Sequence, residues 1–321
     1  MGKLPARARQ AALLVLVLAL VAVPFATSGY FLRLLTLLFT YAIMASAWNL
    51  IGGFTGYTDF GLVVFFGLGA YTTGLLMTKA KLPFLAGWLA GGVVCVVFAV
   101  LMGLLLLRLR GHYFGIATLG TSFAVREVIA NWPSLTGGGT GISLPIYDFP
   151  NSVFYFIMLA LLIVIVSLTR WISRNRLGFG LVAIRENEQA AEVLGVNALR
   201  YKVTAYTLSG FFIGMVGGTY AYWITFIDPD TIFNVGITVQ VIIMAVLGGA
   251  GSVAGPLLGA FILTIISEVL NAYVPGAHLT VLGVIIVLVV LLIPHGVIEY
   301  LSLKRKLSFR SIGATLAETR V

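Results

Sequence analysis

Charged residues are scarce in this sequence, and their scarcity excludes most classes of soluble protein. Only 10% of the 321 residues are Asp, Glu, Lys or Arg, while 60% are hydrophobic. Soluble domains carry roughly 25% charged residues. Apolar stretches close to the ~20 residues that cross a bilayer recur along the whole length. The sequence therefore predicts an all-α membrane protein, and we expect residues 1–321 to form a single transmembrane domain.

The residues needed for metal, disulfide or nucleotide chemistry are also missing. Cys95 is the only cysteine and lies in an apolar run, so we expect a small buried hydrophobic residue. The histidines His112, His278 and His295 have no second ligand at metal spacing. No G-x-x-x-x-G-K-[ST] phosphate loop is present. We therefore expect no metal, no bound cofactor and no enzymatic activity in this chain.

The formal charge of +9 indicates which partner the chain contacts, once the chain is taken to be a membrane protein. Most of the Lys and Arg residues lie in short loops between apolar runs. In that position they set the orientation of the helices and contact anionic lipid headgroups. The charge therefore indicates a lipid membrane and no nucleic acid as the partner.

The apolar runs predict about ten transmembrane helices. They lie near residues 11–27, 31–51, 61–78, 83–107, 113–131, 153–172, 202–222, 236–250, 252–272 and 279–294. The first run follows a basic start, as the apolar part of a signal peptide does. No small-x-small cleavage site follows it, so we favour a retained helix over a cleaved one.

The distribution of Lys and Arg predicts the orientation. The N-terminus, the 170–202 region and the C-terminus are basic, whereas residues 131–152 and 223–236 contain no Lys or Arg. Basic loops face the cytoplasm, so we expect both termini inside and the two Lys- and Arg-free segments outside. Arg33, Lys79 and Lys81 are exceptions, because this scheme places them outside.

Few charges lie within the predicted spans. A charged side chain at the bilayer centre costs at least ~2.5 kcal/mol, so such residues face the protein interior and pair with one another. Arg126 and Glu268 both fall in the last turns before the outer surface. We predict that they form a structural ion pair, and that Arg126 does not pair with its neighbour Glu127, because adjacent helix residues do not face each other.

Two glycine-broken segments, "NLIGGFTGYTDFG" (49–61) and "LGGAGSVAGP" (247–256), interrupt the apolar pattern. Broken backbone at membrane depth is tolerated where it lines a wet cavity or is buried in protein. The first segment and the start of the second supply our candidates for the substrate pathway, which are Asn49, Gly53, Thr55, Gly56, Asp59 and Gly249. A separate four-residue stripe predicts close helix packing, and it consists of Gly210, Gly214 and Gly218.

The stretch "AIRENEQAAEVLGV" (183–196) is polar and helix-forming. Its Ala and Leu residues lie on one face at spacings of three and four, and its charges lie on another. The face is too small and alanine-rich to anchor in lipid. We therefore predict a cytoplasmic helix, at about residues 181–195, that docks on a protein.

Within it, "QAAEVLG" (189–195) resembles the E-A-A-x-x-x-G coupling motif of ABC importer permeases, with Gln189 in place of Glu. Residues 53–76, 107–145, 176–221 and 246–260 are also similar, in the same order, to the branched-chain amino-acid (Liv-type) ABC permeases, M-type subunit. The resemblance implies that the motif and its flanks contact the ATPase. These residues are Arg185, Glu186, Asn187, Glu188, Gln189, Ala190, Ala191, Leu194 and Gly195.

The resemblance also implies a heteromeric importer in a bacterial inner membrane, driven by alternating access. The expected partners are a second related permease, two cytoplasmic ATP-binding subunits that hold ATP and Mg, a periplasmic solute-binding protein and a small amino-acid substrate. The family often reads D-F-G-H, and here Leu62 replaces the His. Two alternatives stay open: a permease for another small polar solute, such as urea, a sugar or an aromatic acid, and an ion-coupled secondary transporter.

Overall fold

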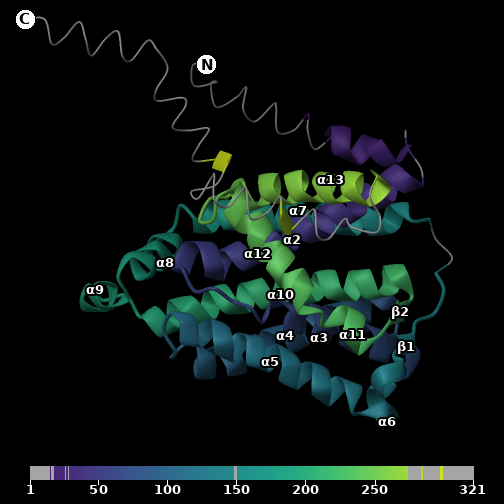
Figure 1. Cartoon of the computed structure of the whole chain (residues 1–321), viewed down its shortest axis with the longest axis horizontal. Helices are drawn as coiled ribbons and strands as arrows, with labels where there is room; N and C mark the ends of the chain where they lie inside the picture. The colour runs from purple at the N-terminus through teal and green to yellow at the C-terminus, as the bar shows by residue number, and fades with distance from the viewer. Residues whose placement is uncertain are drawn as a thin grey trace, which may run out of the picture.

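The computed structural model describes residues 29–147 and 150–273, together with residues 15, 18–25, 27, 283–284 and 297–298. Eight of the predicted spans, from 31–51 to 252–272, coincide with helices in this part of the chain (Figure 1). Of the predicted span at 11–27, residues 15 and 18–25 are described and helical, whereas the span at 279–294 is described only at residues 283–284, and both termini lie outside the described residues. The described elements are α2 (Tyr30–Thr55), α3 (Leu62–Thr78), α4 (Phe84–Leu106), α5 (His112–Ala130), α6 (Pro133–Thr136), the 3-10 turn η1 (Gly138–Thr140), β1 (Ile142–Ser143), α7 (Ser152–Ile172), α8 (Arg176–Glu186), α9 (Glu188–Val193), α10 (Ala198–Ile224), β2 (Phe226–Ile227), α11 (Pro229–Ile232), α12 (Val235–Gly248) and α13 (Gly255–Tyr273).

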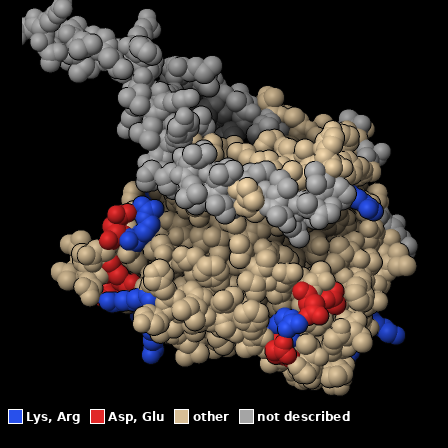
Figure 2. Space-filling view, viewed as in Figure 1, with Lys and Arg blue, Asp and Glu red and all other residues tan. Residues whose placement is uncertain are grey.

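The helices have the length and composition of membrane spans. Among the described residues, five helical stretches are long and apolar enough to cross a bilayer, namely α2, α4, α7, Pro229–Gly248 and α13. On the face shown in Figure 2, the charged side chains gather towards two ends, and the surface between them carries none. Such an uncharged band is what a lipid-facing surface requires. The chain is therefore a multi-pass membrane protein, while the count of ten helices stays a prediction.

Helix α10 lies at the centre of the bundle and packs against α2, α3 and α4. Glycine makes this close packing possible. A methyl group on Gly214 would lie 2.4 Å from Cys95 Sγ, and one on Gly69 would lie 2.0 Å from the Gly214 carbonyl oxygen. The packing role predicted for the Gly210–Gly218 stripe is confirmed. Cys95 is completely buried and free, as predicted.

The two segments that contain no Lys or Arg meet at one end of the molecule. β1 pairs antiparallel with β2, with Ile142 opposite Ile227, and α6 and α11 lie beside them (Figure 1). The basic α8 and α9 region lies at the opposite end. The predicted separation of these regions is thus present in the fold. We call the end with β1 and β2 the outer end and the end with α8 and α9 the inner end, following the predicted orientation.

Candidate functional site

The predicted docking helix is broken into two helices, α8 and α9. Asn187 separates them, with an extended backbone (φ −162°, ψ 108°), and its side chain accepts a hydrogen bond from the Ala190 N–H at 3.0 Å. Asparagine is among the preferred residues for capping a helix N-terminus, because its side-chain oxygen satisfies a free N–H group of the first turn. The prediction of one continuous helix over residues 181–195 was therefore wrong.

Helix α9 projects from the inner end of the bundle (Figure 1). Two large apolar side chains at its C-terminal end are exposed. Val193 is 88% exposed and Leu194 is 82% exposed. Gln189, Ala190 and Glu192 are also exposed, whereas Ala191 is buried against the protein. The predicted face of Ala190, Ala191 and Leu194 is therefore corrected: the surface open to a partner is formed by residues 189, 190 and 192–195, which we call the α9 tip.

The opposite side of α9 is anchored by a buried ion pair. Lys202, at the start of α10, donates from Nζ to Glu188 Oε1 at 2.8 Å, to the Leu107 carbonyl at 2.8 Å and to Tyr57 Oη at 3.0 Å. Tyr57 Oη in turn donates to Glu188 Oε2. The Lys202 side chain is only 2% exposed. We call Glu188, Lys202 and Tyr57 the α9 anchor, and it connects α9 with α10, the end of α4 and the loop before α3.

The environment of the α9 anchor keeps Glu188 ionised. Burial by itself raises the pKa of this carboxyl group, but the hydrogen bonds from Lys202 and Tyr57 outweigh it and hold the pKa below its ordinary value. Burial and the contact with Glu188 raise the pKa of the Tyr57 hydroxyl, which therefore stays protonated and donates. The anchor is a charged, fully bonded contact at neutral pH.

Arg185 reaches into the bundle from the end of α8. Its Nη1 donates to the Gly53 carbonyl at 3.2 Å, and its Nε and Nη2 donate to Glu186 Oε1 at 3.1 and 2.9 Å. The Arg185 Cγ lies 3.0 Å from where a Cβ on Gly56 would stand. The predicted coupling residue Arg185 thus contacts the predicted pathway residues Gly53 and Gly56.

Asn49 joins the two glycine-broken segments. Its Oδ1 accepts a hydrogen bond from the Gly251 N–H at 2.7 Å, and its Nδ2 donates to the Ser252 carbonyl at 2.9 Å. A methyl group on Gly53 would lie 2.4 Å from the Gly251 nitrogen. We call this contact between residues 49–56 and 249–252 the glycine junction. The structure therefore brings together two segments that lie about 200 positions apart in the sequence.

The other pathway candidates also have internal bonding partners. Thr55 Oγ1 donates to the Ile51 carbonyl, and Asp59 Oδ1 accepts from the Gly61 N–H at 2.7 Å. Both side chains are buried. Gly249 follows the last residue of α12 with a φ of +120°, a conformation that favours glycine. A pathway role for these residues stays a prediction, while the geometry gives them packing and hydrogen-bonding roles.

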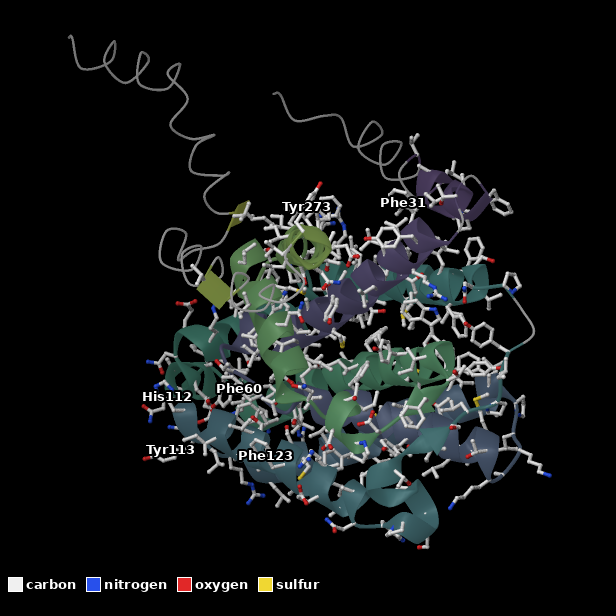
Figure 3. The ribbon with its side chains drawn as sticks, turned by 45° about the vertical axis from the view of Figure 1, so that its right-hand side comes forward. Phe31, Phe60, His112, Tyr113, Phe123 and Tyr273 are labelled. Carbon is white, nitrogen blue, oxygen red and sulfur yellow. The ribbon has the colours of Figure 1, made fainter. Side chains whose placement is uncertain are left out.

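A cavity of about 580 Å³ opens beside the Gly56 turn. Phe60 and His112 contribute to its walls, and Figure 3 shows both of them, with Tyr113, at the same end of the molecule. Leu62, the residue at the position where the family often has His, begins α3 and is completely buried. It gives that position an apolar side chain with no access to a ligand.

The predicted ion pair between Arg126 and Glu268 was wrong. Arg126 binds Asp230 through Nε and Nη2, and its Nη1 donates to Glu127 Oε1 at 2.6 Å. Glu268 accepts a hydrogen bond from the Tyr30 hydroxyl instead. The physical reason is that α5 packs on α11, which carries Asp230, whereas α13 packs on α2 and α12. The long Arg126 side chain also reaches Glu127, contrary to our expectation for adjacent residues.

Sequence reasoning missed two residues of the α9 anchor. From the sequence, Lys202 is one basic residue among several near the inner surface. A signal was present, because a lysine at the edge of an apolar run requires a partner, and Glu188, which immediately precedes the motif, lies fourteen positions before Lys202. Tyr57 had no comparable signal.

Comparisons with known proteins agree with the resemblance in the motifs. A family model described as "Branched-chain amino acid transport system / permease component" matches residues 30–290. The chain is 31% identical over 316 residues to the high-affinity branched-chain amino acid transport system permease protein LivM of Salmonella typhimurium (strain LT2), covering 89% of this chain and 74% of LivM. It is 24% identical over 282 residues to LivH of Escherichia coli (strain K12), covering 81% of this chain and 91% of LivH. It is 28% identical over 193 residues to the autoinducer 2 import system permease protein LsrC of Salmonella paratyphi B, covering 53% of each chain.

Proposed function

This chain belongs to the family of branched-chain amino acid transport permeases, and we propose that it is a permease subunit of an ATP-driven ABC importer for branched-chain or related amino acids. It provides part of the membrane passage and hydrolyses nothing itself. ATP and Mg bind to two cytoplasmic ATPase subunits, and a periplasmic solute-binding protein delivers the substrate. The assembly resides in a bacterial inner membrane.

A second permease completes the passage. The similarity of this chain to both LivM and LivH supports a related permease chain as the neighbour in the membrane. Each of those two proteins is named as a permease protein of a high-affinity branched-chain amino acid transport system. We expect the two permease chains to enclose the substrate between them.

The observation that carries the proposal is the α9 tip. Val193 and Leu194 are two large apolar residues, 88% and 82% exposed, on a short helix that stands clear of the bundle. Exposed apolar residues clustered on one projection are typical of a protein contact. Helix α9 has only six residues, too few to be stable without tertiary contacts, so its position depends on the α9 anchor. The ATPase surface is the expected partner of the tip.

The contacts behind the α9 tip provide a route for coupling. A displacement of α9 acts on Glu188, and Glu188 is bonded to Lys202 of α10 and to Tyr57 in the loop before α3. A displacement of α8 acts on Arg185, which is bonded to the glycine junction through the Gly53 carbonyl. Both contacts are short and partly buried, so they move the attached helices together with α8 and α9. ATP-driven closure of the ATPases would thereby reach α2, α10 and α13 and open or close the passage.

A second class of transported solute is also a candidate. The similarity to the autoinducer 2 permease LsrC over about half of the chain supports a family that carries other small polar molecules, and a fold alone does not decide the substrate. Uptake of labelled leucine, urea, a sugar and an aromatic acid by the same complex separates these alternatives.

The test of the coupling assignment is co-purification of the ATPase subunits. In Leu194→Asp, a charge replaces an 82% exposed apolar residue of the α9 tip, and we expect loss of the bound ATPases and of transport. Leu135→Asp is the matched control, since Leu135 is exposed at the opposite end, in α6, and it should keep both. ATPases that co-purify normally with Leu194→Asp would refute the coupling role of α9. Leucine uptake without any ATPase subunit would instead favour an ion-coupled transporter.

A further inference from the structure

A second polar feature lies at the outer end, far from α9. A cavity of about 760 Å³ opens there between α2, α10, α13 and the segment that follows β1. This volume falls within the ~300–1,000 Å³ range of small-molecule sites. Figure 3 shows Phe31, from the first turn of α2, and Tyr273, the last residue of α13, along one edge of the molecule. The residues of this cavity that matter below are Tyr30, Arg33, Tyr147, Tyr220, Trp223 and Glu268.

The cavity contains one side chain of each charge, and the two do not neutralise each other. Within the described residues, Arg33 has no side-chain hydrogen bond or ion pair, and Glu268 has no cation within ion-pair distance. Glu268 accepts one hydrogen bond, from Tyr30, which fixes the position of its carboxylate. Charged residues in membrane-spanning helices are costly, and when they face a cavity they indicate a functional site.

Part of the cavity wall is aromatic. Tyr220 and Trp223 come from the last turns of α10, and Tyr147 comes from the segment before α7. Thr225, which follows α10, holds this wall in place. It has a φ of +60°, which is uncommon for a non-glycine residue. Its carbonyl accepts a hydrogen bond from the Leu144 N–H at 2.8 Å. The aromatic surface is suited to an apolar side chain.

We propose that this outer cavity binds the free amino acid as it enters the membrane, with Arg33 binding the carboxylate, Glu268 binding the ammonium group and the aromatic wall contacting the apolar side chain. The inference deepens the proposed function and rests on it, because it assigns the substrate of the importer to particular residues of this chain. A zwitterionic lipid headgroup has the same pair of charges, so the experiment has to separate the two sources.

The experiment uses the permease complex as purified with its ATPases, embedded in lipid nanodiscs without the solute-binding protein, and labelled L-leucine as the probe. Leucinol, which lacks the carboxylate, and 4-methylpentanoate, which lacks the ammonium group, serve as competitors. We expect each analogue to compete at least about tenfold more weakly than leucine, since a hydrogen bond to a charged group is lost. Nanodiscs of phosphatidylcholine and of phosphatidylethanolamine provide the lipid arm.

The variants assign each charge to its group. Arg33→Gln should weaken leucine binding at least about tenfold and remove the preference for leucine over leucinol, while Glu268→Gln should remove the preference over 4-methylpentanoate. Lys81→Gln and Glu127→Gln delete exposed charges elsewhere in the outer loops and helix ends and should change neither preference. Arg33→Lys keeps the charge and should retain part of the discrimination, which covers the case that Arg33→Gln does not assemble.

Four outcomes would overturn the inference. The first three are no leucine binding to the wild-type complex at millimolar concentrations, equal competition by all three compounds, and unchanged discrimination in both charge-deleted variants. The fourth is a dependence on the lipid. If Arg33→Gln changes leucine binding in nanodiscs of one lipid and not in those of the other, the cavity binds a lipid headgroup. Co-purification of the ATPases and leucine uptake with the binding protein are recorded in parallel, so the outer site can fail while the proposed function stands.

Discussion

The α9 anchor at the inner end of the helix bundle and the charged residues at the outer end are held in opposite ways. At the inner end, Lys202 is 2% exposed and its ammonium group is bonded to three acceptors on three different segments. At the outer end, Arg126 is 33% exposed and its partner Asp230 is 75% exposed, and Arg33 has no ion-pair partner among the described residues. A buried, fully bonded charge links helices rigidly, whereas an exposed one is free to meet a ligand.

The packing of the backbone also differs between the two ends. At the inner end, the glycine junction brings α2 and the segment before α13 so close that Gly53 has no room for a side chain. At the outer end, the same two helices, together with α10, leave a cavity of about 760 Å³. The comparison teaches that α2 and the segment before α13 are held together at the inner end, beside α8 and α9. At the outer end, where the substrate is expected to arrive, a cavity lies between α2 and α13.

The largest expected effect comes from cutting the α9 anchor. Glu188→Gln leaves the buried Lys202 without its carboxylate, and removing one partner of a buried ion pair costs about 3–5 kcal/mol. We expect a clearly lower unfolding temperature of the purified complex and ATP hydrolysis that no longer drives transport.

Glu186→Gln is the matched control for that change. Glu186 is 70% exposed and pairs with Arg185 at the surface, and exposed pairs contribute about 0–1 kcal/mol. Adding Lys202→Met to Glu188→Gln should restore part of the stability, because no unpaired buried charge remains, but not the coupling. Equal unfolding temperatures for Glu188→Gln and Glu186→Gln would contradict the contrast between the buried inner pair and exposed pairs.

A smaller effect is expected from loosening the glycine junction. Gly53→Ala places a methyl group 1.8 Å from Asn49 Oδ1 and 2.4 Å from the Gly251 nitrogen, and overpacking of this kind costs typically about 1–3 kcal/mol. Helix α2 and the segment before α13 must then separate, so leucine uptake should fall while the ATPases stay bound. Gly120→Ala in α5 meets nothing within 4 Å and should leave uptake unchanged. Full uptake by Gly53→Ala would show that the close packing at the glycine junction is not required for transport.

Periodicity and composition predicted the helices well, because membrane spans depend on apolar runs that are visible in the sequence. The span predicted at 153–172 corresponds to α7 at Ser152–Ile172, and that at 83–107 to α4 at Phe84–Leu106. Boundaries were less accurate where a helix extends past its apolar part. Helix α10 begins at Ala198, before the predicted start at residue 202. The Asn197 side chain caps this helix start by accepting a hydrogen bond from the Arg200 N–H at 3.0 Å.

Side-chain pairing was harder to predict, because it depends on which helices are neighbours. The prediction for Arg126 and Glu268 used depth in the membrane, which is one coordinate, and depth does not show that α5 and α13 pack on different partners. The break at Asn187 was missed for another reason: a helical wheel assumes continuity and gives no weight to a capping residue. The same residues that the wheel placed on one face, Ala191 and Leu194, turn out buried and exposed.

The smallest expected effect belongs to the outer ion pair, and it sharpens the comparison of the two ends. Arg126→Gln removes an exposed contact with Asp230, and exposed ion pairs contribute little to stability, so we expect little or no change in the unfolding temperature of the complex. The change should shrink further at high salt, since screening weakens exposed pairs, whereas the cost of Glu188→Gln should hardly depend on salt because Lys202 is buried. Thermal unfolding of both variants at low and high ionic strength measures this difference. If the effect of Arg126→Gln were as large as that of Glu188→Gln and equally insensitive to salt, burial would not be what distinguishes the inner end from the outer end.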